Sequence, residues 1–269
     1  MMSLIVGIRF HKGGKTYHFD ATGFPDLEEG DYVVVETMRG QQLGQIVVFV
    51  DPGGSTGDQN WKPIQRKATP RDLVLRQILE GKEEQALAYS QQLGRDLALE
   101  EVKFVSAEYS LDGENLIFLY SYDGKEDPDL SEFLKRLGDR FPEHHVELRR
   151  IGPRDAAKII GGMGACGKGI RCCTEYMTEF EPISIRMAKE QGVSLAPSEI
   201  TGMCGRLRCC LMYEHEQYLD AKEGLPECGK RVNTPRGEGE VVRLNPLQKE
   251  VHVDLGESGV QKFENQEIE

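Results

Sequence analysis

The stretch "EVKFVSAEYSLDGENLIFLYSYD" (residues 101–123) decides the fold of this chain. Two runs rich in β-branched and aromatic residues, 101–110 and 115–123, flank the dipeptide Asp112-Gly113. Such dipeptides favour tight turns between antiparallel strands. The stretch therefore predicts a β-hairpin.

Helical patterns lie on both sides of this hairpin. Before it, "TPRDLVLRQILEG" (69–81) offers Thr69 as N-cap and Pro70 at the first helical position. The next stretch, "KEEQALAYSQQLGRDLALE" (82–100), has leucines at helical spacing. We expect two helices here, with an apolar face formed by Leu73, Ile78, Leu79, Leu87, Leu93 and Leu97.

Two further elements follow the hairpin. The stretch "DPDLSEFLKRLGDRF" (127–141) predicts a helix, and "HVELRRI" (145–151) predicts a strand. The inward face of this helix is expected to carry Leu130, Phe133, Leu134 and Leu137. The centre of the chain is thus predicted to be a helical pair followed by β-β-α-β, an α+β unit.

The two ends of the chain are predicted to be small β-barrels. Residues 4–50 give four short β-rich runs separated by glycine turns, and residues 51–63 are typical of a loop or linker. Residues 229–263 again give short strands, and both ends share a Gly-x-x-Val…Arg-Gly…Gly-x-Val-Val layout, which fits two barrels of one SH3-like kind or two unrelated hairpins. We expect an α+β protein with an antiparallel N-terminal barrel (1–65), a central α+β domain (66–151), a cysteine-rich segment (152–225) and an SH3-like C-terminal barrel (226–269).

Composition restricts the function. The chain has 269 residues and a net charge of −12, which disfavours a protein that coats nucleic acid. No window approaches the ~20 apolar residues of a membrane span, and "MMSLIVGIRFHKGG" lacks the basic region of a signal peptide. We expect a cytoplasmic protein, in which the seven cysteines are not disulfides.

Six cysteines form two similar trios. "GMGACGKGIRCC" (162–173) and "GMCGRLRCC" (202–210) have the spacings C-x5-C-C and C-x4-C-C, and a tyrosine follows three residues after each pair. Thiolates suit zinc or iron–sulfur clusters, and the spacing differs from that of a zinc ribbon. The alternative is that these are small buried residues only. The candidate ligands are Cys166, Cys172, Cys173, Cys204, Cys209 and Cys210.

Basic residues surround the trios. Residues 149–171 hold six positive side chains against one acid, Asp155, and two more lie in the second trio. Positive charge favours the thiolate, compensates the charge of a cluster or attracts RNA phosphates; the plain alternative is a solvated basic face. The candidate RNA or cluster-charge contacts are Arg149, Arg150, Arg154, Lys158, Lys168, Arg171, Arg206 and Arg208.

The chain contains no P-loop, GxSxG or HExxH motif, so no catalytic residues are assigned. His215, in "LMYEHEQY", is the histidine nearest the cysteines. A role as accessory ligand competes there with the plainer assignment as a surface residue of a helix.

These motifs resemble the bacterial YaaT (RicT) family, which carries a PSP1 C-terminal domain. The resemblance rests on "RRIGPRDAAKIIGGMGACGKGIRCC", "FEPISIRMAKEQGVSLAPSEITGMCGRLRCCLMYE" and "FLKRLGDRF", and it extends over nearly the whole chain. It implies a PSP1 domain at about 66–150 and a non-catalytic adaptor that carries 4Fe–4S clusters on the six cysteines. The implied partners are the helical proteins RicA (YmcA) and RicF (YlbF) and the endonuclease RNase Y, and the implied process is mRNA processing. In sporulating bacteria it also implies effects on the phosphorelay, biofilm formation and competence.

Three functions stay open from the sequence. The first is the iron–sulfur adaptor, and the second is a zinc-stabilised RNA-binding protein that acts alone. The third is a redox enzyme that uses thiols.

Overall fold

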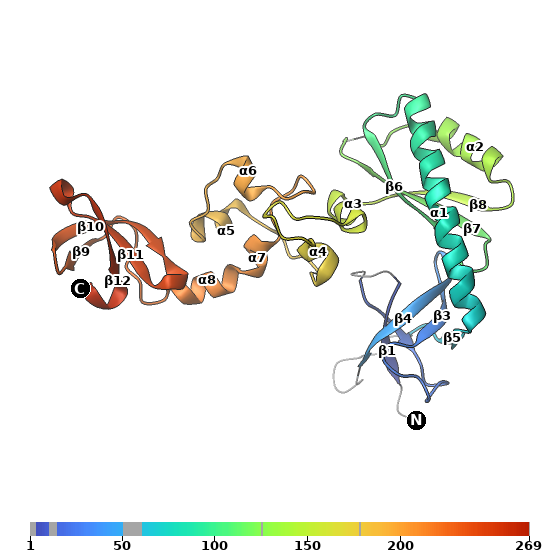
Figure 1. Ribbon diagram of the computed structural model, residues 1–269, viewed down its shortest axis with the longest axis horizontal. Helices are drawn as coiled ribbons and strands as arrows, with labels where there is room; N and C mark the ends of the chain where they lie inside the picture. Colours follow the sequence, from blue (N-terminus) through green and yellow to red (C-terminus); the bar gives the residue numbers. More distant parts are fainter. Residues whose placement is uncertain (1–3, 11–14, 51–60, 125, 178, 269) are drawn as a thin grey trace. The chain divides into compact units, whose positions relative to one another are not determined.

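The computed structural model describes residues 4–10, 15–50, 61–124, 126–177 and 179–268 (Figure 1). The predicted turn at residues 12–14 and most of the predicted linker at 51–63 lie outside the described residues. The chain divides into two compact units, Met1–Glu179 and Phe180–Glu269.

The first unit begins with an antiparallel sheet of five strands in the order β2-β1-β4-β3-β5. Its inner face buries Val6, Ile8, Val33, Val35 and Ile46 because alternate residues of each strand point to the same side. β5 was not predicted, since "IQRK" is short and has a single apolar residue. The strands are β1 (Ile5–Arg9), β2 (Tyr17–Asp20), β3 (Tyr32–Thr37), β4 (Gly40–Val50) and β5 (Ile64–Lys67).

One long helix follows, α1 (Pro70–Asp96), where the sequence predicted two. Thr69 caps it as predicted, and Asp72 completes a capping box. Gly81 does not interrupt the helix, because a lone glycine costs only about 1 kcal/mol and Arg76 binds Glu83 across it at 2.8 Å.

The predicted apolar face of α1 is only partly correct. Leu79 and Leu93 are buried, and Leu87 and Leu97 pack against the same core. Leu73 and Ile78, in contrast, are exposed. The error arose because Leu73 and Ile78 extend the apolar pattern around α1 to positions that the core does not cover.

The central sheet joins the antiparallel hairpin β6 (Val102–Tyr109) and β7 (Asn115–Tyr122) to β8 (His145–Arg150), which runs parallel to β7. The hairpin at Asp112-Gly113 is confirmed. Helix α2 (Ser131–Arg140) buries Phe133 and Leu137, while Leu134 is exposed against expectation. The core also contains Leu116, Phe118 and α1 side chains, so α1 and α2 cover this sheet (Figure 1).

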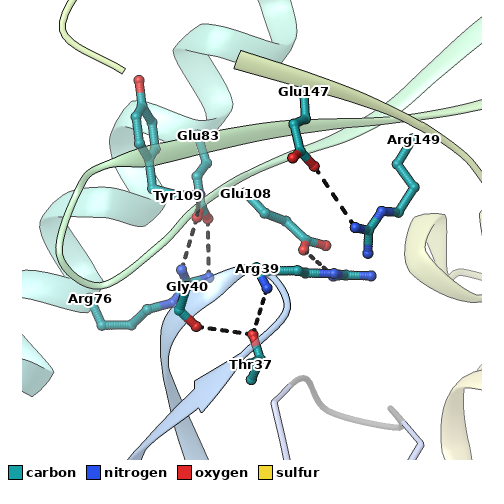
Figure 2. Close-up of polar contacts among 9 residues, drawn as sticks. All are labelled: Thr37, Arg39, Gly40, Arg76, Glu83, Glu108, Tyr109, Glu147 and Arg149. Carbon is teal, nitrogen blue, oxygen red and sulfur yellow. Dashed lines mark hydrogen bonds and ion pairs between the residues drawn. The ribbon is translucent and has the colours of Figure 1, made fainter. Parts of the chain in front are cut away.

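An ion pair joins the N-terminal sheet to the central sheet. The β3–β4 turn points Arg39 at Glu108 of β6, with Nη1 of Arg39 2.6 Å from Oε2 of Glu108 (Figure 2). Beside it, Glu83 of α1 accepts hydrogen bonds from Arg76 and from the backbone amide of Tyr109. Two sheets far apart in sequence are thereby fixed to each other within one unit.

Short helices make up the cysteine-rich segment. Their small core in the second unit contains Ala188, Ile200 and Leu211. The helices are α3 (Pro153–Ile160), α4 (Cys172–Glu175), α5 (Ile185–Glu190), α6 (Pro197–Ile200), α7 (Cys210–Tyr213) and α8 (His215–Lys222).

A second antiparallel sheet ends the chain, in the order β12-β11-β10-β9. It buries Val232, Val241, Val251, Val253 and Phe263. The α+β fold class with β-rich ends is confirmed. The strands are β9 (Arg231–Thr234), β10 (Gly237–Asn245), β11 (Glu250–Asp254) and β12 (Val260–Glu264), and the short turns η1 (Pro246–Gln248), η2 (Gly256–Ser258) and η3 (Asn265–Glu267) lie between or after them.

The two terminal sheets share one hairpin turn, Thr-x-Arg-Gly. The hydroxyl of Thr37 donates to the Gly40 carbonyl at 3.0 Å and accepts from the Arg39 amide. The hydroxyl of Thr234 makes the same bonds, to the carbonyl of Gly237 at 2.7 Å and from the amide of Arg236. The shared sequence layout of the two ends thus corresponds to a shared turn.

Candidate metal centre

The first cysteine loop (residues 161–173) is built around a tight turn. The amide of Gly167 donates to the Gly164 carbonyl at 3.0 Å, and the amide of Gly164 donates to the Lys168 carbonyl at 2.8 Å. Gly167 has a φ of 86°, which glycine adopts without strain. Cys166 sits inside this turn and is exposed.

The second cysteine loop (residues 201–210) repeats this turn. The amide of Gly205 donates to the Gly202 carbonyl at 3.0 Å, and the amide of Gly202 donates to the Arg206 carbonyl at 2.8 Å. Gly205 has a φ of 74°. Cys204 therefore occupies the position that Cys166 occupies in the first loop.

The cysteine pairs are also equivalent. The amide of Tyr176 donates to the Cys172 carbonyl at 3.1 Å, and the amide of Tyr213 donates to the Cys209 carbonyl at 3.1 Å. Each pair thus opens one helical turn that the trailing tyrosine closes. The loops differ by one residue between turn and pair, "KGIR" against "RLR". The matched thiols are Cys166 with Cys204, Cys172 with Cys209, and Cys173 with Cys210.

The six thiols, all in the described part of the chain, form no disulfides and differ in exposure. Cys166 is exposed and Cys173 is buried, while the other four are half-buried. A Cβ placed on Gly164 would lie 3.4 Å from the Cys166 sulfur, and one on Gly202 would lie 3.7 Å from the Cys204 sulfur. The turn thiol therefore folds back over the first glycine in both loops.

Two lysines lie near the thiols of the first trio. The pKa of Lys168 is raised, chiefly by the hydrogen bond from its ammonium group to the Glu175 carboxylate. The nearby Cys172 and Cys166 thiols add to this increase. Nζ of Lys168 also lies 4.7 Å from the centre of the Tyr176 ring. Burial lowers the pKa of Lys158, although Asp155 and the Cys173 thiol oppose the shift.

Other members of the basic segment have partners of their own. Arg149 lies 3.8 Å from Glu147 (Figure 2), and Arg150 binds Asp127. Arg154 lies on α3 and Arg206 lies in the second turn. The local excess of positive charge seen in the sequence is thus reduced by acids outside residues 149–171.

The sequence did not reveal what Arg171 and Arg208 bind. Nη1 of Arg171 donates to the Ala157 carbonyl at 2.6 Å, and Nη2 of Arg208 donates to the Ser198 carbonyl at 2.7 Å. Both were candidate RNA or cluster contacts. The only sign in the sequence that Arg171 and Arg208 have equivalent roles was the repeated "RCC" triplet that each of them begins.

His215 is half-buried at the start of α8. Its Nε2 lies 3.5 Å from Oε2 of Glu190, and its buried Nδ1 has no hydrogen-bond partner among the described residues. The structure therefore places it among neighbours of the second trio without joining it to the thiols.

The donor set fits a thiolate-bound metal group in its chemistry. Each loop offers three sulfur atoms, and Lys168 places positive charge near two of those in the first loop. Among the residues that the structure describes, however, no three His, Cys, Asp or Glu side chains gather around one point as a metal site. One trio lies in each compact unit.

Comparison with known proteins identifies the family. The model of the "PSP1 C-terminal conserved region" matches residues 62–151, and that of the "PSP1-like protein, third domain" matches residues 182–225. The "Stage 0 sporulation protein YaaT" of Bacillus subtilis is 39% identical over 259 residues, which cover 93% of this chain and 90% of that protein. The chain belongs to the YaaT family of PSP1 proteins.

The PSP1 region of this YaaT-family chain coincides with β5, α1 and the central sheet. The third-domain match begins after the first trio and contains the second. No solved structure matches the chain. Within the described part of the chain, no helix combines the length and apolar character that a membrane crossing requires.

Proposed function

We propose that this chain is a non-catalytic regulatory adaptor of the cytoplasm that holds iron–sulfur through its two cysteine trios. With small helical partners of the RicA and RicF kind, it directs mRNA processing by an endonuclease of the RNase Y type. The observation that carries the proposal is the duplicated loop, in which six thiols occupy matched positions. The relative named for sporulation supports a regulatory role.

The ligands in this proposal are Cys166, Cys172 and Cys173 from one loop and Cys204, Cys209 and Cys210 from the other. A 4Fe–4S cluster takes four thiolates, so each trio leaves one ligand to be supplied from elsewhere. Bound to these thiols, a cluster supplies a redox-sensitive inorganic core. The residues of the chain present the sulfurs and place Lys168 and its positive charge near two of them.

Anaerobic purification tests the proposal. A brown protein with absorbance near ~400 nm and matching iron and sulfide is the expected result. Colourless protein with stoichiometric zinc would instead favour a zinc-stabilised RNA-binding protein. Metal-free protein with a dithiol that titrates near neutrality would favour thiol redox chemistry. Either of the last two results contradicts the iron–sulfur proposal.

A further inference from the structure

Arg171 and Arg208 make two equivalent hydrogen bonds in the two loops, and each adds a third bond to the helix that precedes its loop. The backbone amide of Arg171 donates to the Gly162 carbonyl at 3.1 Å, and that of Arg208 donates to the Ile200 carbonyl at 2.8 Å. These amide bonds tie the residue before each cysteine pair to the start of its loop.

The side chains repeat the pattern. Nε of Arg171 donates to the Met163 carbonyl at 3.1 Å, and Nε of Arg208 donates to the Thr201 carbonyl at 3.3 Å. Met163 and Thr201 each immediately precede the first glycine of the turn. The terminal nitrogens reach Ala157 of α3 and Ser198 of α6. The Ala157 carbonyl also accepts from the Gly161 amide at 3.1 Å, so Arg171 adds a second donor at the end of α3, while Arg208 caps the end of α6 at Ser198.

This geometry fixes three parts of each loop relative to one another. One arginine connects the preceding helix, the glycine turn that carries Cys166 or Cys204, and the residue before the cysteine pair. A guanidinium reaches the two carbonyls with Nε and a terminal nitrogen held in one plane, whereas a lysine ammonium carries its donors on one atom at the end of a flexible stem and cannot reproduce this geometry. The repeat in two separate units argues against an accidental contact.

We propose that Arg171 and Arg208 are positioning residues that hold the paired thiols of each trio in place against the turn thiol. They act through the backbone, and not as charge partners of a bound group. That these thiols bind a metal rests on the proposed function. The placement of the thiols, in contrast, is a property of the chain itself.

The first test uses the metal-free, reduced full chain and mass-resolved alkylation of each cysteine. In Arg171→Lys, Cys173 should react about tenfold faster, as expected when charged hydrogen bonds are lost, while Cys210 keeps its rate. In Arg208→Lys, Cys210 should react faster and Cys173 should not change. The unchanged trio serves as the internal reference, and an unchanged circular dichroism spectrum shows in each case that the variant has folded.

The control variants remove positive charge without touching the loops. Arg149 pairs with Glu147 on β8, and Arg186 pairs with Glu190 on α5. Arg149→Gln and Arg186→Gln should leave both rates as they are. Unchanged rates at Cys173 in Arg171→Lys and at Cys210 in Arg208→Lys would overturn the proposal.

The second test separates position from charge with Cd²⁺, whose binding to thiolates gives an ultraviolet charge-transfer band. Lysine variants keep the positive charge, so a charge role predicts wild-type Cd²⁺ affinity for them and loss only in glutamine variants. Positioning predicts that lysine and glutamine weaken binding alike, by about tenfold or more. Wild-type affinity in the lysine variants would overturn the proposal. A wild-type chain that binds neither Cd²⁺ nor iron would remove the proposed function, while the alkylation pattern would still decide the placement of the thiols.

Discussion

Arg39 on the β3–β4 turn binds Glu108 on β6 at 2.6 Å, and the carboxylate end of this pair is 91% buried. The pair connects the N-terminal sheet to the PSP1 region. Removing one partner of a buried pair leaves an uncompensated charge, which costs more than the pair itself contributes.

We therefore expect Arg39→Ala to lower the free energy of unfolding of the first unit by about 2–4 kcal/mol. Arg39→Ala combined with Glu108→Gln should recover part of this loss, because no carboxylate is then left without its partner. Fluorescence of Trp61, the single tryptophan, reports urea unfolding of this unit. Additive effects of the two changes would show that the pair is not coupled.

Asp72 should make the free energy of unfolding depend on pH in the acidic range. The Arg66 guanidinium, at 2.6 and 2.8 Å, holds the pKa of this carboxyl well below its ordinary value of 3.8, and Thr69 contributes further hydrogen bonds. Because the folded pKa is lowered, this stabilisation is complete above about pH 4 and is lost as the pH falls further.

In Asp72→Asn, this contribution is absent at every pH. The variant should lose about 1–3 kcal/mol at pH 7, and its deficit relative to wild type should shrink below pH 4. Urea titrations at pH 7 and pH 3 measure the difference. A deficit that stays constant with pH would contradict the assignment.

The trio cysteines should differ from Cys228 in metal content. Cys172→Ser and Cys209→Ser remove matched thiols of the two loops, so each should lose metal or cluster. Cys228 is exposed and lies outside the repeat, so Cys228→Ser is the matched control and should keep its metal. Iron, sulfide and zinc are measured per chain after anaerobic purification; equal content in all three variants would refute the ligand assignment.

Iron content should also depend on partners. Three thiols per loop leave a 4Fe–4S cluster one ligand short, which a partner cysteine can supply. We expect iron per chain to rise towards about eight when the chain is reconstituted with its small helical partners. About four irons for the chain alone, unchanged by partners, would indicate one site made from both trios.

RNA binding by the isolated chain should be weak. The net charge of −12 repels phosphate, and several basic residues near the first trio already bind acids. Any binding should fall about tenfold or more between 50 and 200 mM salt, and further in Arg154→Glu. Filter binding across a salt series checks this, and tight binding that ignores salt would contradict it.

The fold class could be predicted from the sequence because short local motifs mark where the helices and strands begin and end. Asp112-Gly113 fixed the hairpin and Thr69-Pro70 fixed the start of α1. Gly81 led to the wrong prediction of two helices. The free-energy cost of one glycine in a helix is small compared with the gain from packing a long helix on a sheet. Leu73 and Ile78 are exposed because the core does not cover their positions on α1. The spacing of apolar residues along the helix does not indicate where the core ends.

The candidate site was predictable as a set of residues but not as a geometry. Repeated cysteines pointed to the thiols, and the matched turns give each one a counterpart. The partners of Arg171 are backbone carbonyls up to 14 residues away. A pattern of side chains does not indicate hydrogen bonds to backbone carbonyls. From their charge alone, the arginines were therefore predicted to contact RNA or a cluster.

The boundary between the two compact units has a consequence for the unfolded chain. It separates the trios, so a metal group bound by both would act as a cross-link, as a disulfide does. It would close a loop of roughly 30 residues between Cys173 and Cys204 and disfavour the unfolded ensemble by about 3–4 kcal/mol. A group held within one trio closes a loop of only a few residues and contributes about 2 kcal/mol. Through loop length alone, a group shared by both trios would therefore disfavour the unfolded chain by about 1–2 kcal/mol more than a group held within one trio.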